Sequence, residues 1–199
     1  MTWDASDARR STSAHKRETV HVALVGDQGS SAALDHFAHD LADALAAYEH
    51  LGFPGRERVF DLDLVSLRLD ECAHDCEQSL AGLPEASRLY ALAVTTGPTP
   101  QGPARALETL SKACEAHNVA WGGGVAIAGG ELAALCATGP RMGRMRRAQS
   151  EAIDQLVLAI RTRSGLQELP DGPDTGIIAV PAPVPTCLYG LALKLHRLG

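Results

Sequence analysis

The sequence predicts an α/β fold, in which helices cover both faces of a parallel β-sheet and form a three-layer sandwich. Apolar runs of strand length occur at residues 20–25, 58–66, 89–94 and 119–127. Segments whose apolar residues repeat at helical spacing separate these runs. A strand, a helix and a second parallel strand form a βαβ unit, and repeats of this unit build a covered parallel sheet.

The segment 87–130 shows this unit most clearly. Its first strand, LYALAV, is continuously apolar, as expected for a strand that is buried on both faces. A loop with two glycines and three prolines follows at 95–103, and a helix leads from it to the strand 119–127. Ligands of open parallel sheets bind outside the carboxyl ends of the strands. We therefore expect a site at this loop and at Gly129 and Gly130.

The first strand, 19–27, leads through GDQGSS into a helix over 32–50. The apolar residues of this helix form one stripe, which comprises Leu34, Phe37, Ala38, Leu41 and Leu45. A strand, a Gly/Ser loop and a helix N-terminus with Ser30 or Ser31 as N-cap can bind an anion. The loop is consistent with a phosphate site and equally with an ordinary tight turn.

The remaining elements are predicted from the same patterns. A half-covered strand, two helices, a short strand before a proline-rich bend and a last helix are expected at 58–67, 70–83, 144–163, 177–185 and 187–199. The apolar stripe of the 144–163 helix comprises Met145, Ala148, Ala152, Leu156, Val157 and Ile160. Residues 1–18 are polar and aperiodic, which predicts a disordered tail before a single domain at 19–199.

Composition excludes several classes of function. The 199 residues are 45% hydrophobic, as expected for one domain with a sizeable core. The net charge of −6 and the lack of a basic stripe argue against nucleic acid as a partner. No apolar run reaches about 18 residues and no signal peptide is recognisable, so no membrane partner is predicted. The five cysteines are expected to be reduced thiols of a cytoplasmic protein.

Two clusters of polar residues allow a functional and a structural interpretation. Cys72 and Cys76 lie one helical turn apart, but His74 faces away and no second ligand pair exists, so buried thiols are favoured over a metal site. An arginine cluster at the start of the 144–163 helix could meet the phosphates of NADPH or form a solvated charged face. It comprises Arg141, Arg144, Arg146 and Arg147. No catalytic triad or acid–base pair is visible, so no catalytic residue is predicted.

Several motifs together resemble the flavodoxin-like NAD(P)H-dependent oxidoreductases, of which this chain would be a divergent member. The family has a strand followed by a polar loop, a Trp-Cys helix, a glycine-rich strand opened by tryptophan, and a tail in which Leu-Tyr opens the last helix. The matching segments here are TTGPTP at 95–100, Ala-Cys at 113–114, WGGGVAIAGG at 121–130 and VPAPVPTCLYGLALKL at 180–195. The resemblance covers residues 20–50 and 87–199.

This resemblance implies an FMN-dependent oxidoreductase that passes electrons from NAD(P)H to a quinone, a flavin or another small acceptor. The loop after the first strand would hold the FMN phosphate, the 95–99 amides would border the isoalloxazine, and two glycines would allow close approach of the ring. The implied cofactor-binding residues are Gly26, Gln28, Gly29, Ser30, Ser31, Thr95, Thr96, Gly97, Pro98, Thr99, Gly129 and Gly130. Pro98 contributes no amide N–H.

Three departures from the family pattern support a second hypothesis. Asp27 replaces a neutral serine of the phosphate loop, one strand is missing before residue 89, and Val65 and Pro98 stand where aromatic residues flank the flavin. The chain could therefore be a flavodoxin-like protein that has lost FMN. It would then act as a binding or assembly partner, or use the crevice for another small molecule.

The last helix is unusually apolar for its position at the chain end. Its stripe of Leu188, Leu191, Leu195 and Leu198 must cover the core or meet another subunit. Together with Trp121 on the glycine-rich strand, this stripe predicts a homodimer.

Overall fold

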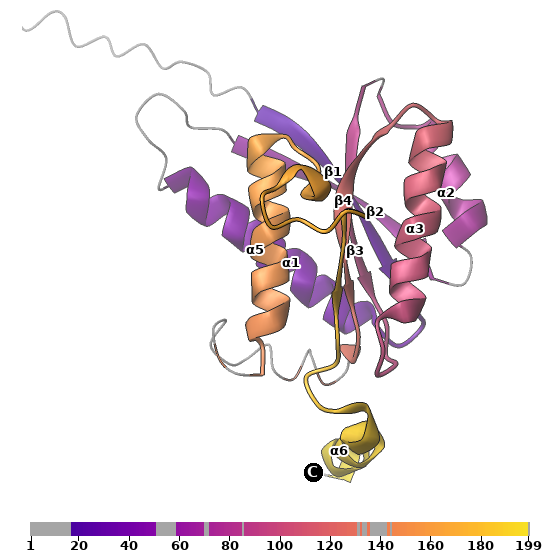
Figure 1. Ribbon diagram of the computed structural model, residues 1–199, viewed down its shortest axis with the longest axis vertical. Helices are drawn as coiled ribbons and strands as arrows, with labels where there is room; N and C mark the ends of the chain where they lie inside the picture. The colour runs from indigo at the N-terminus through magenta and orange to yellow at the C-terminus, as the bar shows by residue number, and fades with distance from the viewer. Residues whose placement is uncertain are drawn as a thin grey trace, which may run out of the picture.

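The computed structural model describes residues 17–50, 59–69, 72–84, 86–130, 132, 135, 143 and 145–198. In this part of the chain five parallel strands form one sheet, and helices pack on both of its faces (Figure 1). The α/β three-layer prediction is thus confirmed.

The elements follow the predicted order. The strands are β1 (Arg17–Gly26), β2 (Val59–Arg68), β3 (Arg88–Val94), β4 (Ala120–Ile127) and β5 (Ile177–Val180). The helices are α1 (Ser31–His50), α2 (Cys72–Ala81), α3 (Gln101–Ala116), α5 (Arg147–Thr162) and α6 (Thr186–Leu198), with a 3₁₀ turn η1 at Leu166–Glu168. One boundary was wrong, because β1 begins at Arg17 and so includes two residues of the predicted tail. Residues 1–16 lie outside the described part.

The strand order is β2-β1-β3-β4-β5, which is the flavodoxin-like order. The described residues between α1 and β3 contain one strand, β2, which lies at a sheet edge. The prediction that one strand is missing was wrong, because five strands in this order make up the flavodoxin-like sheet. The carboxyl ends of all five strands are in register: Gly26 pairs with Arg68 and Val94, Val94 with Ile127, and Ile127 with Val180. The loops that follow the strands therefore share one edge of the sheet.

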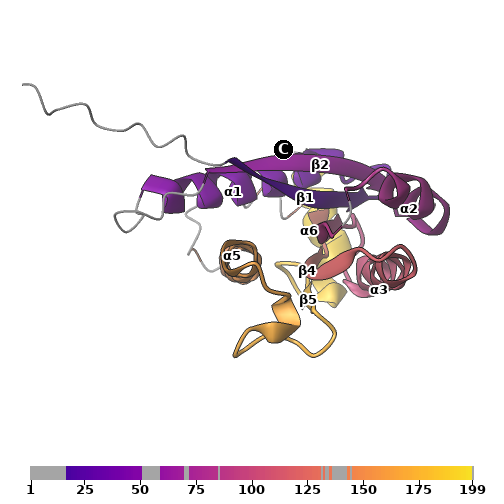
Figure 2. The ribbon, with the colours of Figure 1, turned by 90° about the horizontal axis from the view of Figure 1, so that it is seen from above.

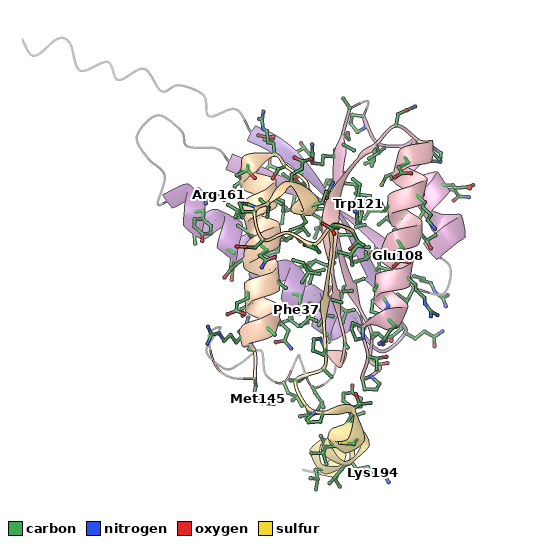
Figure 3. All side chains as sticks on the ribbon, viewed as in Figure 1. Phe37, Glu108, Trp121, Met145, Arg161 and Lys194 are labelled. Atoms are coloured by element: carbon green, nitrogen blue, oxygen red, sulfur yellow. The ribbon has the colours of Figure 1, made fainter. Side chains whose placement is uncertain are left out.

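Two apolar cores lie on opposite faces of the sheet. Helices α1 and α5 cover one face, and α2 and α3 cover the other (Figure 2). All five residues of the predicted α1 stripe are buried, and Phe37 lies between the helices and the sheet (Figure 3). Burial of each large apolar side chain stabilises the fold by roughly 1.5–3 kcal/mol.

The predicted stripe of the 144–163 helix needs correction. Met145 precedes the helix, which begins at Arg147, and both Met145 and Ala148 are exposed. The buried arc instead includes Gln149, Ser150 and Ile153. This arc is wider than one stripe because α5 packs against both the sheet and α1.

The connection from β4 to β5 differs in hand from the others. The crossovers from β1 to β2 and from β3 to β4 move across the sheet in opposite directions, and their helices, α1 and α3, lie on opposite faces. These two crossovers therefore have the same handedness. The crossover from β4 to β5 moves in the same direction as that from β3 to β4, but its helix α5 lies on the opposite face, beside α1. Its handedness is therefore opposite to that of the other two. Crossovers of the uncommon hand are rare. As α5 already covers the face beside α1, α6 lies beyond the carboxyl edge (Figure 1).

Candidate functional site: a crevice at the carboxyl edge of the sheet

Three loops meet where β1, β3 and β4 end. The amide of Gly129 donates to the carbonyl oxygen of Gly97 at 2.7 Å, and that of Gly130 donates to the carbonyl oxygen of Thr95 at 2.8 Å. The loop after β1 joins them through Asp27, as described below. The structure therefore brings together the three groups of residues that the sequence assigned to one site.

The Asp27 carboxylate lies at the centre of this arrangement. Its Oδ2 accepts hydrogen bonds from the Thr96 amide at 2.7 Å, the Thr95 hydroxyl at 2.9 Å and the Thr96 hydroxyl at 3.0 Å. Its Oδ1 accepts one longer bond, of 3.3 Å, from the amide of Gly29. The carboxylate thus takes up donors from both loops that were predicted to face a ligand.

These hydrogen bonds determine the charge of Asp27. Burial by itself would raise the pKa of this carboxyl group, but the hydrogen bonds from Thr96 and Thr95 outweigh burial. The pKa is therefore lower than the usual value of 3.8, because donors stabilise the charged form. Asp27 carries a negative charge at neutral pH.

The predicted phosphate loop is closed by its own residues. Ser30 is fully buried, and both its hydroxyl and its amide donate to the carbonyl oxygen of Asp27, at 3.0 and 3.1 Å. Gly26 is required here, because a Cβ at that position would lie 2.5 Å from the Ser30 hydroxyl oxygen. Gln28 is exposed, and Ser31 is exposed as the first residue of α1.

Three of the amides that were predicted to border the isoalloxazine already donate hydrogen bonds within the chain. The Thr95 amide donates to Ile127, the Thr96 amide to Asp27 and the Gly97 amide to the Thr95 hydroxyl. Pro98 has no amide N–H, so Thr99, which is exposed, provides the last amide of the predicted set.

Gly129 and Gly130 are needed by the fold itself. Gly129 has a φ of +72°, and a Cβ there would lie 2.8 Å from that of Ala182. A Cβ at Gly130 would approach Val94 to 3.1 Å and the Thr95 carbonyl oxygen to 3.3 Å. The close approach that these glycines permit is therefore made by the chain itself, at Gly129 by the segment that leads into α6 and at Gly130 by the end of β3.

Helix α6 contacts the site through one buried side chain. The Tyr189 hydroxyl donates to the carbonyl oxygen of Thr96, the residue whose amide and hydroxyl hold Asp27. Tyr189 is 5% exposed, whereas the leucines on the other side of α6 are open to solvent. The Leu-Tyr motif thus joins the last helix to the loop after β3.

An open crevice of about 520 Å³ lies beside Asp27. It is lined by Asp27, Gln28, Gly29, Leu69, Thr96 and Gly102, from the ends of β1, β2 and β3 and the start of α3. This is the place where the strand order reverses between β1 and β3, which is the usual ligand position in doubly wound sheets.

Comparison with known proteins identifies no relative: no family model, no curated protein and no solved structure matches this chain. The fit of FMN is therefore judged from the residues at the carboxyl edge. The donors that would hold its phosphate already bind a carboxylate, which would also repel the phosphate. These residues do not fit FMN in the arrangement described, and FMN binding stays a prediction.

The other candidate groups are accounted for separately. Arg146 is buried and forms a hydrogen-bonded ion pair with Asp40, while the exposed Arg147 pairs with Glu151 on its own helix. Arg147 therefore belongs to a solvated charged face, one of the two predicted alternatives, whereas Arg146 does not. Arg141 and Arg144 lie outside the described residues. Within the described ranges, no group of three His, Cys, Asp or Glu residues could hold a metal, and no helix could cross a membrane. The side chains of Cys72 and His74 also lie outside them.

Two features, the hydrogen bonds of Asp27 and the ion pair of Asp40 with Arg146, were not predicted from the sequence. Asp27 was considered only as a departure from a neutral serine, although the Thr-Thr pair that follows β3 could have indicated donors for a carboxylate at the end of β1. The ion pair of Asp40 and Arg146 had no local signal, because the two residues lie 106 positions apart.

Proposed function

We propose that this chain is a flavodoxin-like protein that has lost FMN and uses the crevice beside Asp27 to bind another small molecule. One observation carries the proposal: the Asp27 carboxylate occupies the amides and hydroxyls that a flavin phosphate would need. The segment around Ala182 and Pro183 further supports it, because this segment packs against Gly129 where the flavin ring was expected.

Electrostatics favours this proposal over phosphate binding. A phosphate at the start of α1 would gain roughly 0.3–1 kcal/mol from the helix dipole. It would lie within a few ångströms of a charged carboxylate, and two like charges 4 Å apart repel by about 4 kcal/mol at an effective dielectric constant of 20. Repulsion therefore exceeds the attraction of the helix N-terminus.

An FMN-dependent NAD(P)H oxidoreductase is the second candidate. The specific support for it is the flavodoxin-like strand order, with a crevice at the point where this order reverses. This candidate requires Asp27 to release the Thr96 and Gly29 amides when FMN binds.

Titration of FMN, followed by quenching of its fluorescence, separates the two candidates. We expect the parent protein to be colourless after purification and to show no saturable binding at micromolar FMN. Asp27→Ser should bind FMN at least about tenfold more tightly than the parent, because it frees charge-assisted donor positions and removes the repulsion. Asp43→Ser, which removes an equally charged but exposed residue of α1, is the matched control. A yellow parent protein that binds FMN at micromolar concentration would refute the proposal.

We also propose that α6 forms a homodimer contact. Leu188, Leu191 and Leu195 are 52%, 57% and 64% exposed and share one face of α6. Trp121 takes no part in this contact, because it packs beside Gly176 at the opposite end of the sheet from α6 (Figure 3). Sedimentation velocity at micromolar concentration should give a dimer for the parent and a monomer for Leu191→Glu. A parent monomer would contradict the proposal.

A cytoplasmic location is proposed on the basis of the thiols. Cys114 and Cys187 are free thiols, and burial raises the pKa of Cys114 to about 12. Such a thiol stays protonated and inert, as expected of a buried cysteine with a structural role.

A further inference from the structure

The hydrogen bonds around Asp27 use the donors on this side of the crevice. The hydroxyl hydrogens of Thr95 and Thr96 and the Thr96 amide all point to Asp27 Oδ2. The Ser30 hydroxyl and the Gly29 amide are likewise bound within the loop. A ligand that approaches Asp27 therefore meets oxygen lone pairs, because the neighbouring N–H and O–H groups already donate within the chain.

Two of these oxygen atoms have capacity for a further hydrogen bond. Asp27 Oδ1 accepts one bond of 3.3 Å, which is longer than a typical N–H···O bond, although a carboxylate oxygen accepts two. The Thr96 hydroxyl oxygen uses its hydrogen for Asp27 and keeps its lone pairs. The exposed side chain of Gln28, on the same wall, offers an amide oxygen.

Charge and shape restrict the ligand further. Among the described residues that line the crevice, Asp27 is the one that carries a charge, and the protein as a whole carries −6. Leu69 provides an apolar wall that can pack against an alkyl chain. A divalent metal needs several oxygen ligands, and no group of three candidate metal-ligand side chains occurs in the described ranges. A cation with its own N–H donors fits this set better.

We propose that the crevice binds an organic cation with a primary ammonium head and an apolar chain. The three N–H groups of the ammonium donate to Asp27 Oδ1, to the Thr96 hydroxyl oxygen and to the Gln28 amide oxygen, and the chain lies along Leu69. This inference rests on the proposed function, because FMN in the same crevice would exclude such a ligand.

Chemical-shift titration of the Gly29 and Thr96 amides tests the head group. The probes are n-butylamine, butan-1-ol, butyrate and, as a guanidinium probe, n-butylguanidine, which have a common chain length and differ in head group. We expect n-butylamine to bind with a roughly millimolar dissociation constant, at least about tenfold more tightly than butan-1-ol. Equal binding of amine and alcohol, no binding of the amine, or tighter binding of n-butylguanidine than of n-butylamine would each overturn the proposal.

Variants test the assigned acceptors. Asp27→Asn should weaken n-butylamine binding by more than about tenfold, since it removes the charge of the main acceptor. As this change could disturb the loop, the exposed Gln28 provides a second test. Gln28→Glu should strengthen amine binding about two- to fivefold, and Gln28→Lys should weaken it by a similar factor.

The control variant is Gln167→Glu, which adds the same charge on η1, away from the crevice. Affinities that do not differ between the parent, Gln28→Glu and Gln28→Lys would overturn the assignment. An FMN titration of the same samples tests the proposed function independently. The amine inference can therefore fail while the parent still shows no FMN binding.

Discussion

Replacing Arg146 with methionine should destabilise the protein by about 3–5 kcal/mol at pH values near 8. Arg146 lies just before α5 and its guanidinium forms a hydrogen-bonded ion pair with Asp40 of α1. Both residues are nearly buried, with exposed fractions of 6% and 7%. Methionine retains the apolar part of the side chain but leaves Asp40 as a buried charge without its guanidinium partner.

The neighbouring His36 makes this loss depend on pH. Burial lowers the pKa of His36 below its usual 6.5, Asp40 raises it, and Arg146 lowers it again. In the parent, the lowered folded-state pKa means that stability is lost as pH falls through 6.5, where the unfolded chain binds a proton more readily. Without Arg146 the pKa rises, and protonated His36 can pair with Asp40, whose Oδ2 lies 3.5 Å from His36 Nε2. The difference between parent and variant should therefore be smaller near pH 5.5 than near pH 8.

Urea unfolding, followed by far-ultraviolet circular dichroism at both pH values, measures this difference. The control is the double variant Asp40→Leu/Arg146→Met, which removes both charges and should be much closer to the parent than the single variant. A single variant within about 1 kcal/mol of the parent at the higher pH would refute the reasoning about burial. A loss of equal size at both pH values would refute the role given to His36.

Four further substitutions test the carboxyl edge and α6. Asp27→Ala should cost about 1–3 kcal/mol at neutral pH, because it leaves partly buried donors without an acceptor. As the pKa of Asp27 is lowered in the folded protein, this contribution is present above the unfolded value of 3.8 and disappears as pH falls through the folded value, so urea midpoints of parent and variant should converge in acid. Gly129→Ala should destabilise by roughly 2 kcal/mol through its φ of +72° and the crowding by Ala182. Gly190→Ala, with no neighbour within 4 Å of the added Cβ, should stabilise α6 by up to about 1 kcal/mol, and paired thermal melts compare the two. Tyr189→Phe removes the hydrogen bond to Thr96, which should cost about 1 kcal/mol and speed amide hydrogen exchange in α6.

The fold could be predicted because its signals are local. The LYALAV strand, the Leu34-to-Leu45 stripe and the loop at 95–103 each report their structure within a few residues. Right-handed crossovers then leave few topologies for five parallel strands. The position of α5 on the face beside α1 departs from that rule. No local pattern encoded it, because either face of the sheet can accept an amphipathic helix.

The sequence placed the candidate residues at one edge of the sheet, where the structure brings them together, but it did not predict the hydrogen bonds among them. Gly129 and Gly130 were predicted to allow close approach of a ligand, and Gly26 and Gly29 to form a phosphate loop, whereas each lies where a Cβ would press on another part of the chain. The sequence does not distinguish a glycine that admits a ligand from one that admits a neighbouring loop. In the same way, the hydrogen bonds of Asp27 to Thr95 and Thr96 join residues 68 and 69 positions apart, and they form only once β1 and β3 pair.

One side chain decides which sign of charge the crevice accepts. The strand ends stay in register through backbone hydrogen bonds that do not involve the Asp27 side chain, so a serine at this position would leave the same fold. With serine, the amides of Gly29 and Thr96 would face the crevice as donors for an anion. With aspartate, they turn to the carboxylate, and its second oxygen faces the crevice as an acceptor for a cation. A fixed charge interacts with a ligand charge 4 Å away by about 4 kcal/mol at an effective dielectric constant of 20, several times the contribution of a helix N-terminus. The fold therefore determines where a ligand binds, and residue 27 determines which charge that ligand can carry.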